Sequence, residues 1–62
     1  MSPLCIIERQ TDGGTWIKVC DGSSHPANIK RLLYAAVKAY PLNKKFRAID
    51  SVSKQLLDMA FS

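Results

Sequence analysis

A histidine and two cysteines are the residues of this sequence that could carry out chemistry. His25 follows Cys20 by five residues, and a histidine base beside a cysteine activates the thiolate as a nucleophile. However, His25 directly precedes Pro26, a position typical of a helix cap or a solvated loop. Catalysis also needs convergent groups in a pocket, and a chain of 62 residues is too small to enclose the usual roughly 300–1,000 Å³. We therefore expect no catalytic residues and no enzyme activity.

The same side chains are possible metal ligands. Cys5, Cys20 and His25 supply suitable atoms, but the Cys-x-x-Cys and His-x₃-His spacings of structural zinc sites are absent. The further ligand that such a site needs would have to be Asp21 or water. A glycine-rich phosphate loop is not expected either, because the Gly-Gly step of this sequence closes a hairpin rather than opening a helix. The sequence therefore predicts no metal and no cofactor.

The elements that position these residues begin with a hairpin. Residues 4–9 and 15–20 are rich in β-branched and aromatic side chains, and they flank the Thr-Asp-Gly-Gly sequence of residues 11–14. An Asp-Gly step favours the positive φ angles of a tight turn. This pattern predicts an antiparallel hairpin over residues 4–20.

The centre of the turn decides which residues face each other. With Asp12-Gly13 at the centre, Cys5 lies opposite Cys20, whereas a centre one residue later shifts every pair by two positions and keeps each side chain on its face. Directly opposed cysteines lie close enough to form a disulfide under oxidising conditions. In a cytoplasmic chain we expect reduced thiols instead.

One face of the predicted hairpin is more apolar than the other, and we expect it to form the core. The apolar face carries Leu4, Ile6, Ile17 and Val19, and the mixed face carries Cys5, Ile7, Arg9, Trp16, Lys18 and Cys20.

The segment after the hairpin has the pattern of an amphipathic helix. Pro26 suits a first helical turn, with Ser24 or His25 near the cap, and Pro41 disfavours helical geometry at Tyr40. The inner face repeats at helical spacing and consists of Ile29, Leu32, Leu33, Ala36, Val37 and Tyr40. The pattern predicts a helix over about residues 26–40.

A second helix is predicted over about residues 44–60, capped by Asn43. Its inner face would carry Phe46, Ile49, Leu56, Leu57 and Ala60, widened by Val52 and Met59. The expected fold is therefore α+β, an antiparallel hairpin followed by two amphipathic helices (ββαα), in a single small domain over residues 1–62.

No part of the sequence predicts membrane insertion or export. The start lacks a basic n-region, and the longest apolar run, Leu32–Val37, is much shorter than the roughly 20 residues that span a bilayer. We expect no membrane association and a cytoplasmic protein of bacterial or phage type, which in the phage case acts in the host cytoplasm.

Positive charge is concentrated in the second part of the chain. Residues 1–25 carry two cations and three acids, whereas residues 26–62 carry seven cations and two acids. Lys30, Tyr34 and Lys38 recur at helical spacing on the side away from the apolar stripe, so Tyr34 should be exposed. The predicted partner-binding residues are Lys30, Arg31, Tyr34, Lys38, Lys44, Lys45 and Arg47.

The last three of these cations sit awkwardly in the predicted second helix. Cations at a helix N-terminus are unfavourable by about 0.3–1 kcal/mol each, and Asp58 lies near the other, equally unfavourable end. Either an anion docks at this end, or the helix starts later and the cations occupy a solvated loop. The sequence leaves both interpretations open.

These observations favour a small non-enzymatic regulator, an inhibitor or adaptor, which docks on a larger protein with an acidic surface. The alternative is a nucleic-acid-binding regulator that uses the same basic residues. Because a chain of this length buries only about 60% of its unfolded surface, we also expect a homodimer, or a chain that becomes ordered only on a partner. Its seam would hold the apolar C-terminal end, including Met59 and Phe61.

Overall fold

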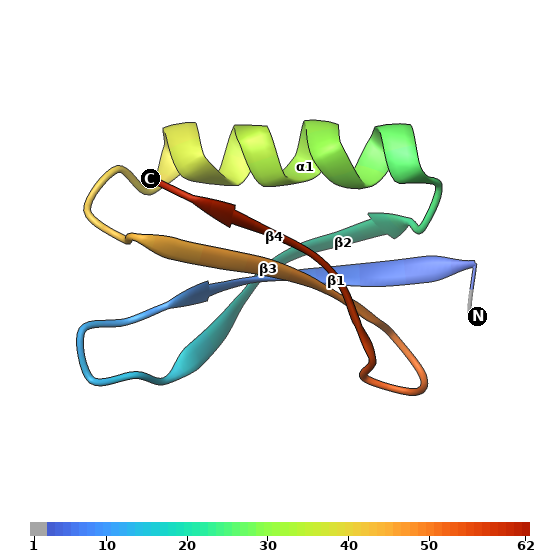
Figure 1. The fold of residues 1–62 in the computed structure, drawn as a ribbon, viewed down its shortest axis with the longest axis horizontal. Coiled ribbons are helices and arrows are strands. Elements are labelled where there is room, and N and C mark those ends of the chain that lie inside the picture. The colour runs from blue at the N-terminus through green and yellow to red at the C-terminus, as the bar shows by residue number, and fades with distance from the viewer. Residues whose placement is uncertain (1–2) are drawn as a thin grey trace.

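The structure, a computed structural model, describes residues 3–62 and contains four strands and one helix. In chain order these are β1 (Leu4–Gln10), β2 (Trp16–Ser23), α1 (Pro26–Ala39), β3 (Lys45–Asp50) and β4 (Leu56–Phe61). The strands form one antiparallel sheet in the order β2-β1-β3-β4, and α1 covers one face of it (Figure 1). The chain thus has a ββαββ order, and the predicted ββαα fold is wrong.

The predicted first hairpin is confirmed, with a different turn. The Thr11 N–H donates to the Thr15 carbonyl at 2.8 Å, and the Gly14 N–H donates to the Thr11 carbonyl at 2.9 Å. Gly14 has a φ of 86°. A three-residue loop that ends on a left-handed glycine is typical of such a hydrogen-bond pattern. Gly14, rather than the Asp12-Gly13 step, therefore supplies the positive φ.

The strand register also corrects the predicted cysteine pair. Cys5 lies opposite Gly22, and Cys20 lies opposite Ile7, which is the register shifted by two residues. A bulge beyond Ile7 then changes the register by one residue, so that Glu8 faces Lys18 and Arg9 faces Ile17. Cys5 and Cys20 are therefore not directly opposed, and both are free thiols.

Helix α1 agrees with its predicted position. Pro26 occupies its first turn, and the His25 ring accepts a hydrogen bond from the Ala27 N–H at 3.3 Å, so His25 is the N-cap. At the other end the Tyr40 N–H donates to the Ala36 carbonyl at 3.0 Å, directly before Pro41. The helix ends where proline geometry requires it to end.

The predicted second helix is wrong, because residues 44–60 form the hairpin of β3 and β4. Strand β3 pairs with the side of β1 that β2 leaves free, so tertiary pairing overrides the weak helical pattern. In β3, Phe46 and Ala48 are fully buried on the α1 side, and Lys45 and Arg47 alternate with them. Lys44, Lys45 and Arg47 thus do not lie at a helix N-terminus, which removes their predicted electrostatic penalty.

The turn between β3 and β4 is organised by a buried carboxylate. Asp50 is 1% exposed, and its side chain accepts hydrogen bonds from the N–H groups of Val52 and Ser53 at 3.1 and 2.9 Å. The Lys54 N–H donates to the Asp50 carbonyl at 3.0 Å, and Lys54 adopts a φ of 64°. This side-chain turn replaces the glycine turn of the first hairpin.

The core lies between α1 and the sheet. Its buried members are Cys5, Ile7, Ile29, Leu33, Ala36, Phe46 and Ala48, and its partly buried members are Val19, Cys20, Leu32, Val37, Leu57 and Ala60. The predicted core face of the hairpin is therefore largely wrong. Leu4 and Ile17 are 51% and 38% exposed, whereas Cys5 and Ile7 face the helix. Of the predicted set, Val19 reaches the core, because the bulge lies beside it.

Candidate functional site

The outer face of α1 is a basic surface. Lys30, Arg31, Tyr34 and Lys38 are all exposed, and the helix contains neither Asp nor Glu. Tyr34 is 64% exposed, as predicted, and the Lys38 Nζ lies 4.5 Å from the centroid of its ring. A cation over an exposed ring contributes about 0.5–1 kcal/mol. This contact holds the tyrosine ring against the helix surface while leaving much of it accessible.

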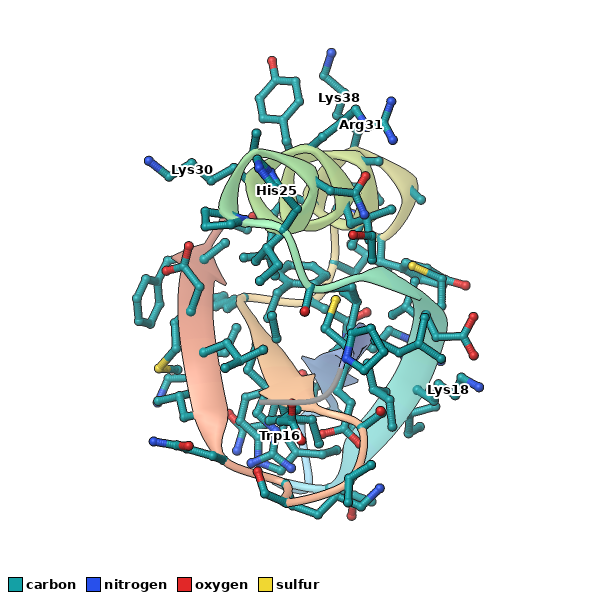
Figure 2. All side chains as sticks on the ribbon, turned by 90° about the vertical axis from the view of Figure 1, so that its right-hand side faces the viewer. Trp16, Lys18, His25, Lys30, Arg31 and Lys38 are labelled. Atoms are coloured by element: carbon teal, nitrogen blue, oxygen red, sulfur yellow. The ribbon has the colours of Figure 1, made fainter. Side chains whose placement is uncertain are left out.

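Lys30 and Arg31 extend in different directions although they are neighbours in sequence. Figure 2 shows Lys30 on the side of the molecule that β4 forms, whereas Arg31 and Lys38 extend from the top of the helix. The Arg31 Nη2 donates to the Asn28 Oδ1 at 2.6 Å, which keeps this guanidinium on the helix surface. The side chains of Lys30 and Arg31 therefore lie on different sides of α1.

A groove of about 440 Å³ separates α1 from β4. It is lined by Lys30, Leu33, Tyr34, Val37, Asp58, Met59, Ala60 and Phe61. Its apolar lining comes from the edge of the helix stripe and from the last strand, and Lys30 and Asp58 are its charged members. Such a mainly apolar concavity with few polar groups is typical of a binding site.

The predicted basic patch is divided by the sheet. Lys45 and Arg47 project from the sheet face opposite α1, because Phe46 between them is buried on the helix side. Lys44 is exposed directly before β3. The structure therefore groups the four predicted residues of α1 and places Arg47 on the other face of the molecule.

Arg47 belongs to a stack of side chains on that face. Its guanidinium carbon lies 4.2 Å from the centroid of the Trp16 ring, and its Nη2 lies 2.7 Å from the Glu8 Oε1. Arg47 and Glu8 face each other in the β1–β3 register. With its charge neutralised and its plane covered by an aromatic ring, Arg47 joins the two hairpins and is a weak candidate for partner binding.

The two thiols lie on the α1 side of the sheet. Burial raises the pKa of the Cys5 thiol, with a smaller contribution from Cys20. Burial also raises the pKa of the Cys20 thiol, and the neighbouring Asp21 adds to the effect. Because the thiolate is the reactive form, both cysteines are poor nucleophiles at neutral pH.

The remaining candidates for chemistry are engaged in structure. His25 caps α1, and Asp50 holds its turn. Within residues 3–62, no three His, Cys, Asp or Glu side chains gather as a metal site requires. Helix α1, the helix within residues 3–62, is too short to cross a membrane.

The groove beside β4 was not predicted, because the sequence of β4 was interpreted as part of a helix. A signal was nevertheless present. The unfavourable charges that the helical interpretation placed at both of its ends, with Lys44 and Lys45 first and Asp58 last, are an argument against a helix there. A strand carries no comparable dipole.

Comparison with protein-family models, with curated proteins and with solved structures found no match to this chain. The function is therefore inferred from the geometry of these surfaces.

Proposed function

We propose that this protein is a non-enzymatic docking domain that binds an acidic surface of a larger protein through the outer face of α1. The observation that carries the proposal is Tyr34, 64% exposed and covered by Lys38 on a helix without acidic residues. Tyrosine and arginine dominate the binding energy of many protein interfaces. A regulator that acts by docking, such as an inhibitor or adaptor, needs only such a binding surface.

A protein partner is favoured over a nucleic acid by the surroundings of Tyr34. The tyrosine lines an apolar groove together with Leu33 and Val37, and an apolar concavity suits a protein side chain better than a phosphate backbone. A basic surface beside an apolar groove combines fast electrostatic association with a site for an apolar anchor.

The test starts from a photo-reactive benzoylphenylalanine at position 34, with the same group at the exposed Val52 as control. A protein cross-linked in a lysate of the native host through position 34 alone is purified and titrated against the unmodified chain. The double substitution Arg31→Gln and Lys38→Gln should raise Kd about tenfold or more. The substitutions Lys18→Gln and Lys54→Gln change the net charge equally and should leave Kd nearly unchanged.

Two outcomes contradict the proposal. Equal effects of both double variants would mean that net charge alone attracts the partner. Tight binding of random duplex DNA or heparin, with a steep loss of affinity as salt rises, would instead support the nucleic-acid alternative. Tyr34→Ala separates attraction by net charge from both ring-dependent modes, because stacking on bases and packing in a protein pocket need the ring whereas charge attraction does not.

A further inference from the structure

Strand β4 forms the edge of the sheet beside the groove, and some of its backbone N–H and C=O groups point away from the sheet. Strand β4 has β3 on one side and no strand on the other within residues 3–62. The Ser62 N–H donates to the Lys44 carbonyl at 3.0 Å, so the residues of β4 that bond to β3 are those in step with Ser62. Because backbone groups alternate along an antiparallel strand, Met59 and Phe61 direct theirs away from β3.

This outward edge runs along the groove. Met59 and Phe61 line the groove from the sheet, and Lys30, Leu33 and Val37 line it from α1. An extended chain laid along β4 would therefore bond to the strand through its backbone and place alternate side chains against the helix. Recognition by strand addition uses this combination, in which the backbone supplies affinity and the pockets supply specificity.

The opposite edge of the sheet is less suited to such an addition. On β2, Lys18 and Asp21 form an ion pair of 3.0 Å along the edge, and a bulge interrupts the strand between them. Charged side chains and bulges are the features that prevent edge strands from pairing with other chains. Strand β4 has its own irregularity near Leu57, but its register from Asp58 to Phe61 is regular.

Charge selects the kind of segment that fits the groove. Lys30 extends on the β4 side of the molecule (Figure 2), and α1 has no acid to neutralise it. A second copy of the chain is a poor occupant, because antiparallel pairing of two β4 strands places both helices on the same face. Two α1 surfaces with three cations each would then flank the seam. An acidic segment meets the opposite charge.

We propose that the partner contributes an extended acidic and apolar segment, which adds to β4 as a fifth strand, places an apolar side chain in the α1–β4 groove and sets a carboxylate beside Lys30. This proposal rests on the proposed function, since it names the form in which the protein partner binds.

Asp58 acts against such a segment. Its Oδ1 accepts a hydrogen bond from the Met59 N–H at 2.8 Å, and its carboxylate lines the groove. The added strand must displace the hydrogen bond between the Met59 N–H and Asp58, because Met59 is one of the two residues whose backbone groups point outward. Acidic side chains of the added strand are also repelled by the Asp58 carboxylate. Removal of the Asp58 side chain should therefore strengthen binding of the segment. Removal of a side chain that only stabilises the fold would not strengthen binding.

The test uses a display library of end-blocked decapeptides with alternating apolar and random positions, selected against the full-length chain. The selected peptides should be enriched in Asp and Glu. Chemical synthesis of the chain with an N-methyl group on Phe61 removes one outward N–H and keeps the side chain. We expect this change to weaken binding at least tenfold, while N-methylation of Asp21 on the β2 edge leaves it unchanged.

Side-chain variants test the groove with matched controls. Lys30→Glu should weaken peptide binding at least tenfold, and Lys18→Glu, the same change of charge on the β2 edge, should weaken it less than threefold. Asp58→Ala should strengthen binding severalfold. Circular dichroism melts of every variant establish that the fold persists.

The results separate this inference from the proposed function. Full binding of the N-methyl-Phe61 chain, combined with loss of binding in Tyr34→Ala or Arg31→Glu, overturns strand addition and leaves docking through α1 in place. A library without binders, or binders without acids, also overturns it. A chain that sediments as a dimer, and becomes a monomer on N-methylation of Phe61, would assign the edge to a second copy.

Discussion

The two hairpins of this protein share a task but use different means. Each supplies one inner and one edge strand, and their turns lie at opposite ends of the sheet (Figure 1). The first hairpin turns on a glycine with positive φ and ends in an edge blocked by charge and a bulge. The second turns on the buried Asp50 carboxylate and ends in the regular edge of β4.

The two hairpins also differ in what they contribute to the core and to the candidate binding groove. The first hairpin closes its side of the molecule, whereas the second carries the central aromatic residue, Phe46, on its inner strand and leaves its outer strand beside a groove. We infer that the second hairpin is both the more important for stability and the more exposed to a partner.

The largest loss should follow Phe46→Ala. Phe46 is fully buried in the core, and truncation of such a residue costs about 3–5 kcal/mol. A domain of this length is stable by only about 3–9 kcal/mol, so the variant should be unfolded in part at room temperature. Urea titration measures the change. Ile17→Ala in the first hairpin, at a residue 38% exposed, should cost about 1 kcal/mol or less.

Asp50→Ala should have the next largest effect. It removes the acceptor for two backbone N–H groups and leaves them unsatisfied in a partly buried turn, at a cost of about 1–3 kcal/mol. Asp12→Ala in the exposed first turn is the matched control and should change the free energy of unfolding by less than about 0.5 kcal/mol. Equal losses in the two variants would contradict the contrast between the turns.

A pair of glycine variants tests the first turn. An added Cβ meets no atom closer than 3.9 Å at Gly13 or Gly14, so the backbone angle decides the outcome. Gly14→Ala should destabilise by about 1–2 kcal/mol, because Gly14, unlike Gly13, has a positive φ. Gly13→Ala should be neutral or stabilise by up to about 1 kcal/mol. If thermal melts show Gly13→Ala to be less stable than Gly14→Ala, the result would support the two-residue turn expected from the sequence.

The smallest effect concerns pH. Burial holds the pKa of the Cys5 and Cys20 thiols above their ordinary value of 9.0. Their stabilising contribution is therefore complete below pH 9 and is lost as the pH rises through the raised pKa values. Urea titrations at rising alkaline pH should show stability declining, with a flatter profile in a Cys5→Ala and Cys20→Ala double variant. Rapid alkylation of the folded chain at pH 8 would contradict this account.

Sequence reasoning succeeded where local chemistry decides the structure. Gly14 permits the positive φ on which the first hairpin turns, and Pro26 and Pro41 bound α1 because proline restricts φ and backbone hydrogen bonding directly. The exposure of Tyr34 followed from helical spacing alone.

It failed where pairing between distant segments decides. Residues 45–50 become a strand because β1 has a free edge, and the spacing of Phe46, Ile49 and Leu56 also fits a helix. The core face of β1 was misassigned because this inner strand is apolar on both sides, with Ile7 toward α1 and Ile6 opposite Ile49 on the other face. The groove depended on β4 and could not be predicted without it.

We infer that the α1–β4 side of the molecule, rather than the β2 side, is the working surface. Hydrogen exchange of the chain, measured free and bound to the tightest peptide selected from the library, distinguishes the two sides. We expect binding to slow exchange at the amides of Met59 and Phe61 and to leave residues 16–23 unchanged. Slower exchange in residues 16–23, with Met59 and Phe61 unaffected, would overturn this inference and assign binding to the first hairpin.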